Sequence, residues 1–280
     1  MLKQSVNPVL AGLKKLANIE RQYIYIVIAL CIIVPLLTQK IMPVRVSSPV
    51  QQAYDTMNKL PTGSCILFSI DYDPSACPEL QPMLLAVLRH AFKCNQKVIM
   101  ICHWPLGFPL GQDALVTCAR EYNKSYGKDY VNLGYRPGVA AVMIGIGREI
   151  RDFFASDYAG RSLDSLPLTT NVHNYNDIAL LIGIEAGSTG DLWVQIANAR
   201  FGQKIVLGST AVVAPDLYPY LQAKQIEGII GGLKGAAEYE TLINHKGSGI
   251  TGMTAQSVAH IAIIIFIIIG NIGYLFLRKK

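Results

Sequence analysis

Residues 64–104 read "SCILFSIDYDPSACPELQPMLLAVLRHAFKCNQKVIMICHW". Two short apolar runs, 64–70 and 97–104, enclose a longer amphipathic stretch at 78–94. The short runs have the length and aliphatic content of strands that are buried on both faces, whereas the stretch between them has helical spacing of its apolar residues. A strand, a crossing helix and a second strand form a unit in which the strands run parallel.

The same alternation continues along the chain. After an amphipathic segment at 48–60, further strands are expected at 177–186, 204–210 and 226–232, and further helices at 109–127, 190–202, 214–224 and 235–245. Two segments, 130–135 and 139–147, are ambiguous, since the second fits either a strand or a helix interrupted by glycines. We therefore expect a doubly wound, Rossmann-like or flavodoxin-like α/β domain with a mostly parallel sheet of five or six strands.

Both ends of the chain are much more apolar than its middle. The stretch between Arg21 and Lys40 carries no charge, and as a helix it spans roughly 27 Å, close to the thickness of a bilayer core. The residues near the other end are rich in isoleucine. We predict membrane spans at 22–40 and 253–277 rather than buried core helices, with the α/β domain at 41–252. No small-residue cleavage site follows the first run, so we expect it to remain as an anchor.

Net charge is informative once it is divided along the chain. Residues 41–252 contain 17 basic and 18 acidic side chains, so the formal net charge of +6 comes from the flanks. The basic segment 1–21 and the basic tail 278–280 predict that both termini are cytoplasmic, in an inner or plasma membrane, and that the domain is extracytoplasmic. This distribution gives no indication of a nucleic-acid partner.

The cysteines leave the disulfide state of the domain open. Their spacing matches no zinc pattern, and an odd number in an exported domain is unusual. Two of them, Cys65 and Cys102, fall inside predicted strands and have the character of small apolar core residues. The five in question are Cys65, Cys77, Cys94, Cys102 and Cys118.

Polar residues follow the predicted strands where each of them ends. Parallel strands bring their carboxyl ends to one edge of the sheet, which is where open α/β sheets bind ligands. The candidate ligand-binding residues at this edge are Asp71, Asp73, His103, Glu185, Ser209 and Thr210.

The Asp71-x-Asp73 pair after an apolar strand resembles the first motif of the haloacid dehalogenase-like phosphatases. The resemblance covers about ten residues and implies a nucleophile at Asp71, a general acid at Asp73 and magnesium between them. Ser75 stands where the family usually has Thr or Val, and the later lysine and acidic pair of the family are not identifiable here. The alternative interpretation is that both acids belong to the turn and the helix cap.

Other catalytic signatures are missing from the sequence. It contains no GxGxxG, P-loop, GxSxG or HExxH pattern, and nothing places His103 or His173 beside a particular acid. We therefore assign no catalytic residue, no metal site and no cofactor.

Two regions have the composition of contact surfaces. Tyrosines between prolines at 215–220 suit a subunit or ligand surface, and small residues in the second span allow another helix to approach. The interface candidates are Tyr218, Tyr220, Gly270, Asn271 and Gly273.

The function favoured by the sequence is a non-catalytic structural or interaction subunit of an oligomeric membrane assembly. Its partners would be the lipid bilayer and other copies of itself or other membrane subunits. The alternative is a membrane-anchored sensor or small-ligand binding domain. A magnesium-dependent, phosphohydrolase-like enzyme is the third and least favoured function.

Overall fold

The computed structural model describes residues 20–38 and 42–278. The chain divides into two compact units. One unit, residues 43–250, contains the whole sheet and is called the α/β unit here. The second consists of the residues up to 42 and those from 251 onward, and it contains the two long apolar helices. The expected cytoplasmic segment 1–21 and the tail 278–280 lie almost entirely outside the described residues.

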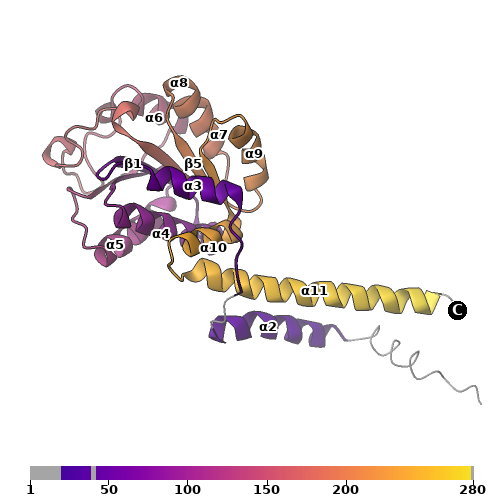
Figure 1. Cartoon of the computed structure of the whole chain (residues 1–280). Helices are drawn as coiled ribbons and strands as arrows, with labels where there is room; N and C mark the ends of the chain where they lie inside the picture. Colours follow the sequence, from indigo (N-terminus) through magenta and orange to yellow (C-terminus); the bar gives the residue numbers. More distant parts are fainter. Residues whose placement is uncertain (1–19, 39–41, 279–280) are drawn as a thin grey trace, which may run out of the picture. The chain divides into compact units, whose positions relative to one another are not determined.

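A sheet of six parallel strands forms the centre of the α/β unit, in the order β3-β2-β1-β4-β5-β6 (Figure 1). The expectation of a parallel sheet with five or six strands is confirmed. The order runs outward from β1 in one direction and from β4 in the other, so the direction of winding changes between these two strands. The strands are β1 (Cys65–Asp71), β2 (Lys97–Cys102), β3 (Tyr130–Tyr135), β4 (Leu180–Glu185), β5 (Ile205–Ser209) and β6 (Gly228–Gly231).

Helices cover both faces of this sheet, because its strands carry apolar side chains on both sides. One face packs against α3 (Ser48–Asn58), α4 (Cys77–Lys93), α5 (Gly107–Glu121) and α10 (Gly232–Leu242). The other face packs against α6 (Val139–Ile146), α7 (Thr189–Trp193) and α9 (Ala214–Gln222) (Figure 1). A π-helical turn, η5 (Val194–Asn198), continues α7 into α8 (Ala199–Phe201).

Segment 139–147, which fitted two patterns, forms the helix α6. Gly138 precedes it with φ 82°, a backbone conformation that glycine adopts at little cost. Within the segment, a Cβ at Gly145 would overlap the Phe153 ring and one at Gly147 would overlap the Phe201 ring. The glycines are therefore explained by close packing of a helix.

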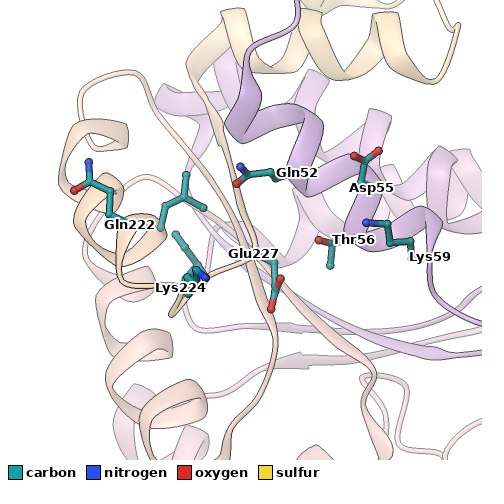
Figure 2. A pocket seen from close by; sticks show the side chains of 9 residues that line it. Gln52, Asp55, Thr56, Lys59, Gln222, Lys224 and Glu227 are labelled. Atoms are coloured by element: carbon teal, nitrogen blue, oxygen red, sulfur yellow. The ribbon is translucent and has the colours of Figure 1, made fainter.

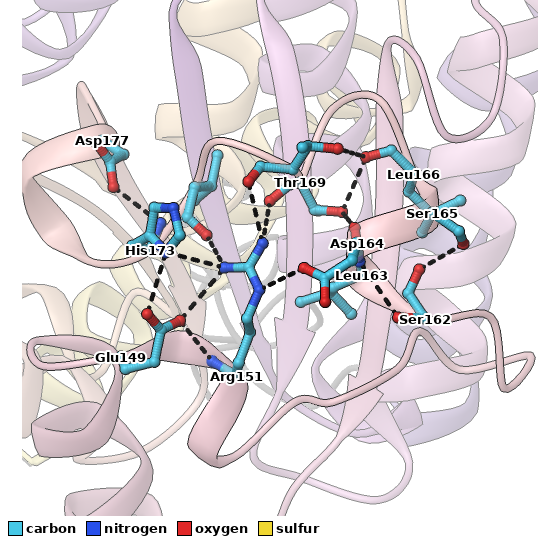
Figure 3. A network of polar contacts seen from close by, with 12 residues as sticks. Glu149, Arg151, Ser162, Leu163, Asp164, Ser165, Leu166, Thr169, His173 and Asp177 are labelled. Atoms are coloured by element: carbon cyan, nitrogen blue, oxygen red, sulfur yellow. Dashed lines mark hydrogen bonds and ion pairs between the residues drawn. The ribbon is translucent and has the colours of Figure 1, made fainter.

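Between α6 and β4 the chain makes a long excursion with short 3-10 turns: η2 (Ile150–Asp152), η3 (Leu163–Ser165) and η4 (Tyr175–Asp177). The guanidinium of Arg151 holds it together (Figure 3). It donates to Asp164 at 2.8 Å and to the carbonyl oxygens of Val172 and Thr169 at 2.8 and 2.9 Å. It also contacts Glu149 at 3.3 Å. One side chain thus joins the beginning and the end of the excursion.

Both chain ends of the α/β unit are fastened to α10. Glu238, 1% exposed, accepts hydrogen bonds from the Ser47 backbone N–H at 2.9 Å and from its hydroxyl, and it pairs with Lys234. Glu240, also 1% exposed, accepts three backbone N–H groups at residues 247–250, where the following helix begins. Two buried carboxylates, two residues apart, therefore hold the entry and the exit of the chain.

The second unit contains the helix α2 (Arg21–Thr38) and most of the helix α11 (Ser248–Arg278). The first residues of α11, up to Ile250, belong to the α/β unit. Both helices are long and apolar enough to cross a membrane. Large apolar side chains are exposed along both, among them Leu30, Leu37, Ile264 and Leu275. This exposure is the pattern of a lipid-facing surface.

The six cysteines are all free thiols. Cys102 is buried in β2 and Cys65 is half-buried at the start of β1, as expected for small apolar residues of a sheet. Burial raises the pKa of the Cys65 thiol to about 12, so this thiol is neutral and unreactive at physiological pH.

Candidate functional site

The carboxyl ends of β1 and β4 flank the point where the winding direction changes, which is the position at which open α/β sheets bind ligands. Asp71 ends β1 and is paired in register with Glu185 at the end of β4. Glu185 is in turn paired with Ser209 at the end of β5. Neighbouring residues in register point to the same face of a sheet. Three of the candidate residues therefore form a row along one edge, which is called the switch-point site here.

Asp71 is fully buried and makes its hydrogen bonds within the protein. One carboxylate oxygen accepts the Ser69 hydroxyl at 2.6 Å, and the other accepts the backbone N–H of His103, just after β2, at 2.7 Å. Burial raises the pKa of Asp71, although the nearby His103 and these hydrogen bonds oppose the effect. The alternative interpretation placed Asp71 in the turn after its strand; its carboxylate instead ties β1 to the end of the neighbouring strand β2.

Glu185 is 1% exposed and only partly satisfied. Its Oε2 accepts the backbone N–H of Gly190 in the first turn of α7, while Oε1 has no hydrogen-bond partner in the described part of the chain. A side chain at Gly190 would overlap this carboxyl group and would have to displace it. Burial, reinforced by the negative charges of Asp71 and Asp191, raises the pKa of Glu185 to about 8. The carboxyl group is therefore mostly protonated at neutral pH.

Three further buried polar atoms at this edge lack a partner among the described residues: His103 Nε2, Trp193 Nε1 and Ser209 Oγ. The side chains that carry them are at most 5% exposed. The His103 and Trp193 rings lie 5.7 Å apart, centroid to centroid. The indole N–H of Trp193 is close enough to favour the charged form of Asp71, but the distance and angle between them do not meet those of a hydrogen bond. Unpaired polar atoms of this kind normally mark water, a ligand or a strained site.

Two sequence candidates lie outside this cluster. Asp73 is the N-cap of the 3-10 turn η1 (Pro74–Ala76), where its carboxylate accepts the Ser75 N–H at 2.9 Å. Thr210 is half-buried, and its carbonyl oxygen accepts N–H groups of residues 213 and 214 at the start of α9. Asp71 and Asp73 thus have separate structural roles, and no group of three metal-ligating side chains gathers in the described part of the chain.

The interface candidates occupy different surroundings. Tyr218 is 43% exposed and lines a groove of about 290 Å³ beside β6 and α10. Tyr220 is half-buried and lies close to Asp191. In α11 a side chain at Gly270 would meet no atom, and the Asn271 amide donates to the Ile267 carbonyl of its own helix at 3.0 Å. Gly273 lies in the same helix.

A larger groove, of about 460 Å³, lies between the second half of α3 and the segment that joins α9 to β6 (Figure 2). Its charged residues are of both signs: Asp55, Lys59, Lys224 and Glu227. It lies at the amino end of β6, whereas helix N-termini and strand ends converge at the carboxyl edge. The switch-point site is therefore the better candidate, although this groove is a well-formed hollow.

His173, the other histidine considered from the sequence, does not belong to the switch-point site. Its Nδ1 contacts Glu149 at 3.1 Å and Arg151 at 3.3 Å within the excursion between α6 and β4 (Figure 3). Its role in the structure is to complete the Arg151 network.

Trp193 and Gly190 were not predicted as site residues. The signal was present in "GIEAGSTGDLW", where a strand is followed by a glycine-rich turn and a short helix that carries an aromatic residue over the strand. The Trp193 ring lies across β4 at Gly183, at 3.5 Å from the position of a Cβ there.

Comparison with protein-family models, curated proteins and solved structures found no match to this chain.

Proposed function

We propose that this chain is a membrane-anchored, non-catalytic binding protein whose doubly wound, Rossmann-like domain recognises a small ligand at the switch-point site. The observation that carries the proposal is the clustering of unpartnered buried atoms. Of six such side-chain atoms in the described residues, four belong to His103, Glu185, Trp193 and Ser209 at this one edge. Each buried polar atom without a partner costs about 1–3 kcal/mol, so a ligand that pairs with them gains binding energy.

The contacts of Asp71 favour binding over phosphoryl transfer. A nucleophilic carboxylate needs an open approach to one oxygen, but both Asp71 oxygens accept hydrogen bonds from Ser69 and His103. The Asp73 carboxylate is engaged as a cap. Neither acid is arranged for the roles that the phosphatase resemblance implies.

Tryptophan fluorescence tests the binding function directly. The chain has two tryptophans, and both lie at this edge: Trp193 in the cluster and Trp104 directly after His103. The full-length protein in detergent is titrated at constant ionic strength with propylammonium chloride, sodium acetate and acetamide, one probe for each charge class. We expect a saturable change with at least one probe, weakened in Ser209→Ala. A linear, non-saturating response to all three would refute the binding function.

The long apolar helices α2 and α11 support anchoring in a membrane, and we propose that both termini are cytoplasmic and that the α/β unit is extracytoplasmic. The basic flanks of the two apolar helices support this orientation. An impermeant thiol reagent applied to intact cells should label Ser125→Cys above the background of the unaltered protein, but not Lys3→Cys. Labelling of position 3 alone would reverse the orientation.

Assembly into an oligomeric membrane complex is the second candidate function. It is favoured by the open space at Gly270, which would let a second helix approach α11 closely. Gly270→Leu should then lower the particle mass measured in mild detergent. An unchanged mass would exclude this face of α11 as the contact.

A further inference from the structure

The two carboxyl groups of the switch-point site have no basic partner. Asp71 and Glu185 form no ion pair with any lysine or arginine in the part of the chain that the structure describes. Asp191 in α7 adds a third acid close enough to act on Glu185. The charged groups around Glu185 are thus Asp71 from β1, Asp191 from α7 and, when protonated, His103 after β2. Buried carboxyl groups without a counter-charge favour a cationic ligand and disfavour an anionic one.

Three aromatic side chains lie on the elements that form this site. Trp193 is fully buried and lies against β4, and Trp104 lies at 3.1 Å from the position of a Cβ at Gly187, in the turn after β4. Tyr220 lies close to Asp191. The face of an indole ring attracts an organic cation within about 6 Å, more strongly in a site that excludes water. A metal ion fits less well, since no three ligating side chains gather in the described residues.

The unpartnered atoms further define the cation. His103 Nδ1 lies 3.3 Å from the Arg136 carbonyl oxygen. With the proton on Nδ1 donated to that oxygen, Nε2 carries a lone pair and accepts hydrogen bonds. The site then offers three unpartnered acceptors: His103 Nε2, Glu185 Oε1 and Ser209 Oγ. A primary ammonium group has three N–H donors, whereas a quaternary ammonium group has none.

From this chemistry we propose that the switch-point site binds a small primary amine in its ammonium form, held by the unpartnered acceptors of His103, Glu185 and Ser209 and covered by Trp104 and Trp193. The proposal rests on the binding function proposed above and names the ligand class. The acceptors are buried in this structure, so entry of the amine requires a local opening of the site.

Ligand charge and pH separate this proposal from binding in general. Propylammonium should saturate the fluorescence change, whereas tetramethylammonium, acetate and acetamide should bind at least about tenfold more weakly. Because the cation favours ionised Glu185, binding releases a proton below about pH 8. The affinity for propylammonium should therefore rise between about pH 6 and about pH 8, by at most tenfold for each pH unit.

Variants complete the test. Glu185→Gln should weaken propylammonium binding about tenfold or more and remove most of its pH dependence. Glu227→Gln, at an exposed carboxylate, is the matched control and should change neither, and urea unfolding of each variant confirms that it folds. Saturation by acetate or acetamide instead would leave the binding function standing and overturn the amine. Equal propylammonium affinity and pH dependence in Glu185→Gln and the unaltered protein would also overturn it, and saturation by no probe would refute both.

Discussion

Replacing Glu185 by glutamine should make the α/β unit more stable at alkaline pH. Burial beside Asp71 raises the pKa of Glu185 from 4.5 to about 8, so the folded protein holds this proton more tightly than the unfolded chain. The resulting stabilisation is complete below about pH 4.5 and is lost as the pH rises through about 8. At 1.36 kcal/mol for each pH unit, the whole effect is at most about 5 kcal/mol.

Relaxation and entry of water lower this ceiling, so we expect about 2–3 kcal/mol. Glutamine resembles the protonated acid, and its amide oxygen can still accept the Gly190 N–H. Urea unfolding of the full-length protein, followed by tryptophan fluorescence, reports on the α/β unit because both tryptophans lie in it. Glu185→Gln should match the unaltered protein near pH 5 and exceed its stability near pH 9, with Glu227→Gln as the control. Parallel pH profiles for the two proteins would show that Glu185 does not titrate as described.

Three further substitutions test separate parts of the structure. Gly190→Ala places a methyl group against Glu185 and should cost about 1–3 kcal/mol of unfolding free energy, measured by the same urea titration. Arg151→Lys cannot reproduce the forked contacts of the guanidinium, so limited proteolysis should cut within residues 147–178 while the rest of the unit stays intact. Glu240→Gln loses an acceptor oxygen for the start of α11, and hydrogen exchange at residues 247–250 should accelerate; unchanged exchange would contradict the role of this carboxylate.

Most of the sheet could be predicted because five of its strands are short, largely aliphatic runs between turn residues, whereas β3 contains Asn132 and Gly134 and was ambiguous. Segment 139–147 could not be assigned to a strand or a helix from the sequence. Its glycines make room for the rings of Phe153 and Phe201, and Phe201 lies far along the chain. The order of the strands was likewise out of reach, because it depends on which way each crossover helix turns, and no residue encodes that alone.

The site shows the same division between local and long-range information. That Asp71, His103, Glu185 and Ser209 share an edge follows from their positions at the ends of parallel strands. Their arrangement in one row requires the register between strands, which the sequence does not reveal. Trp193 was overlooked because its contact with the strand-end residues depends on how α7 packs, and a lone tryptophan in a helix is usually a core residue.

The attachment of both chain ends to α10 has a mechanical consequence. Tension applied to the residues before Ser47 or after Gly247 passes first into Glu238 and Glu240, and so into one short helix. That helix follows β6, a four-residue edge strand that pairs only with β5 among the described strands. Loads from the two chain ends are thus concentrated at one edge of the sheet. Pulled from its ends, the unit should yield by peeling α10 and β6 away, while β1 to β5 keep their pairing.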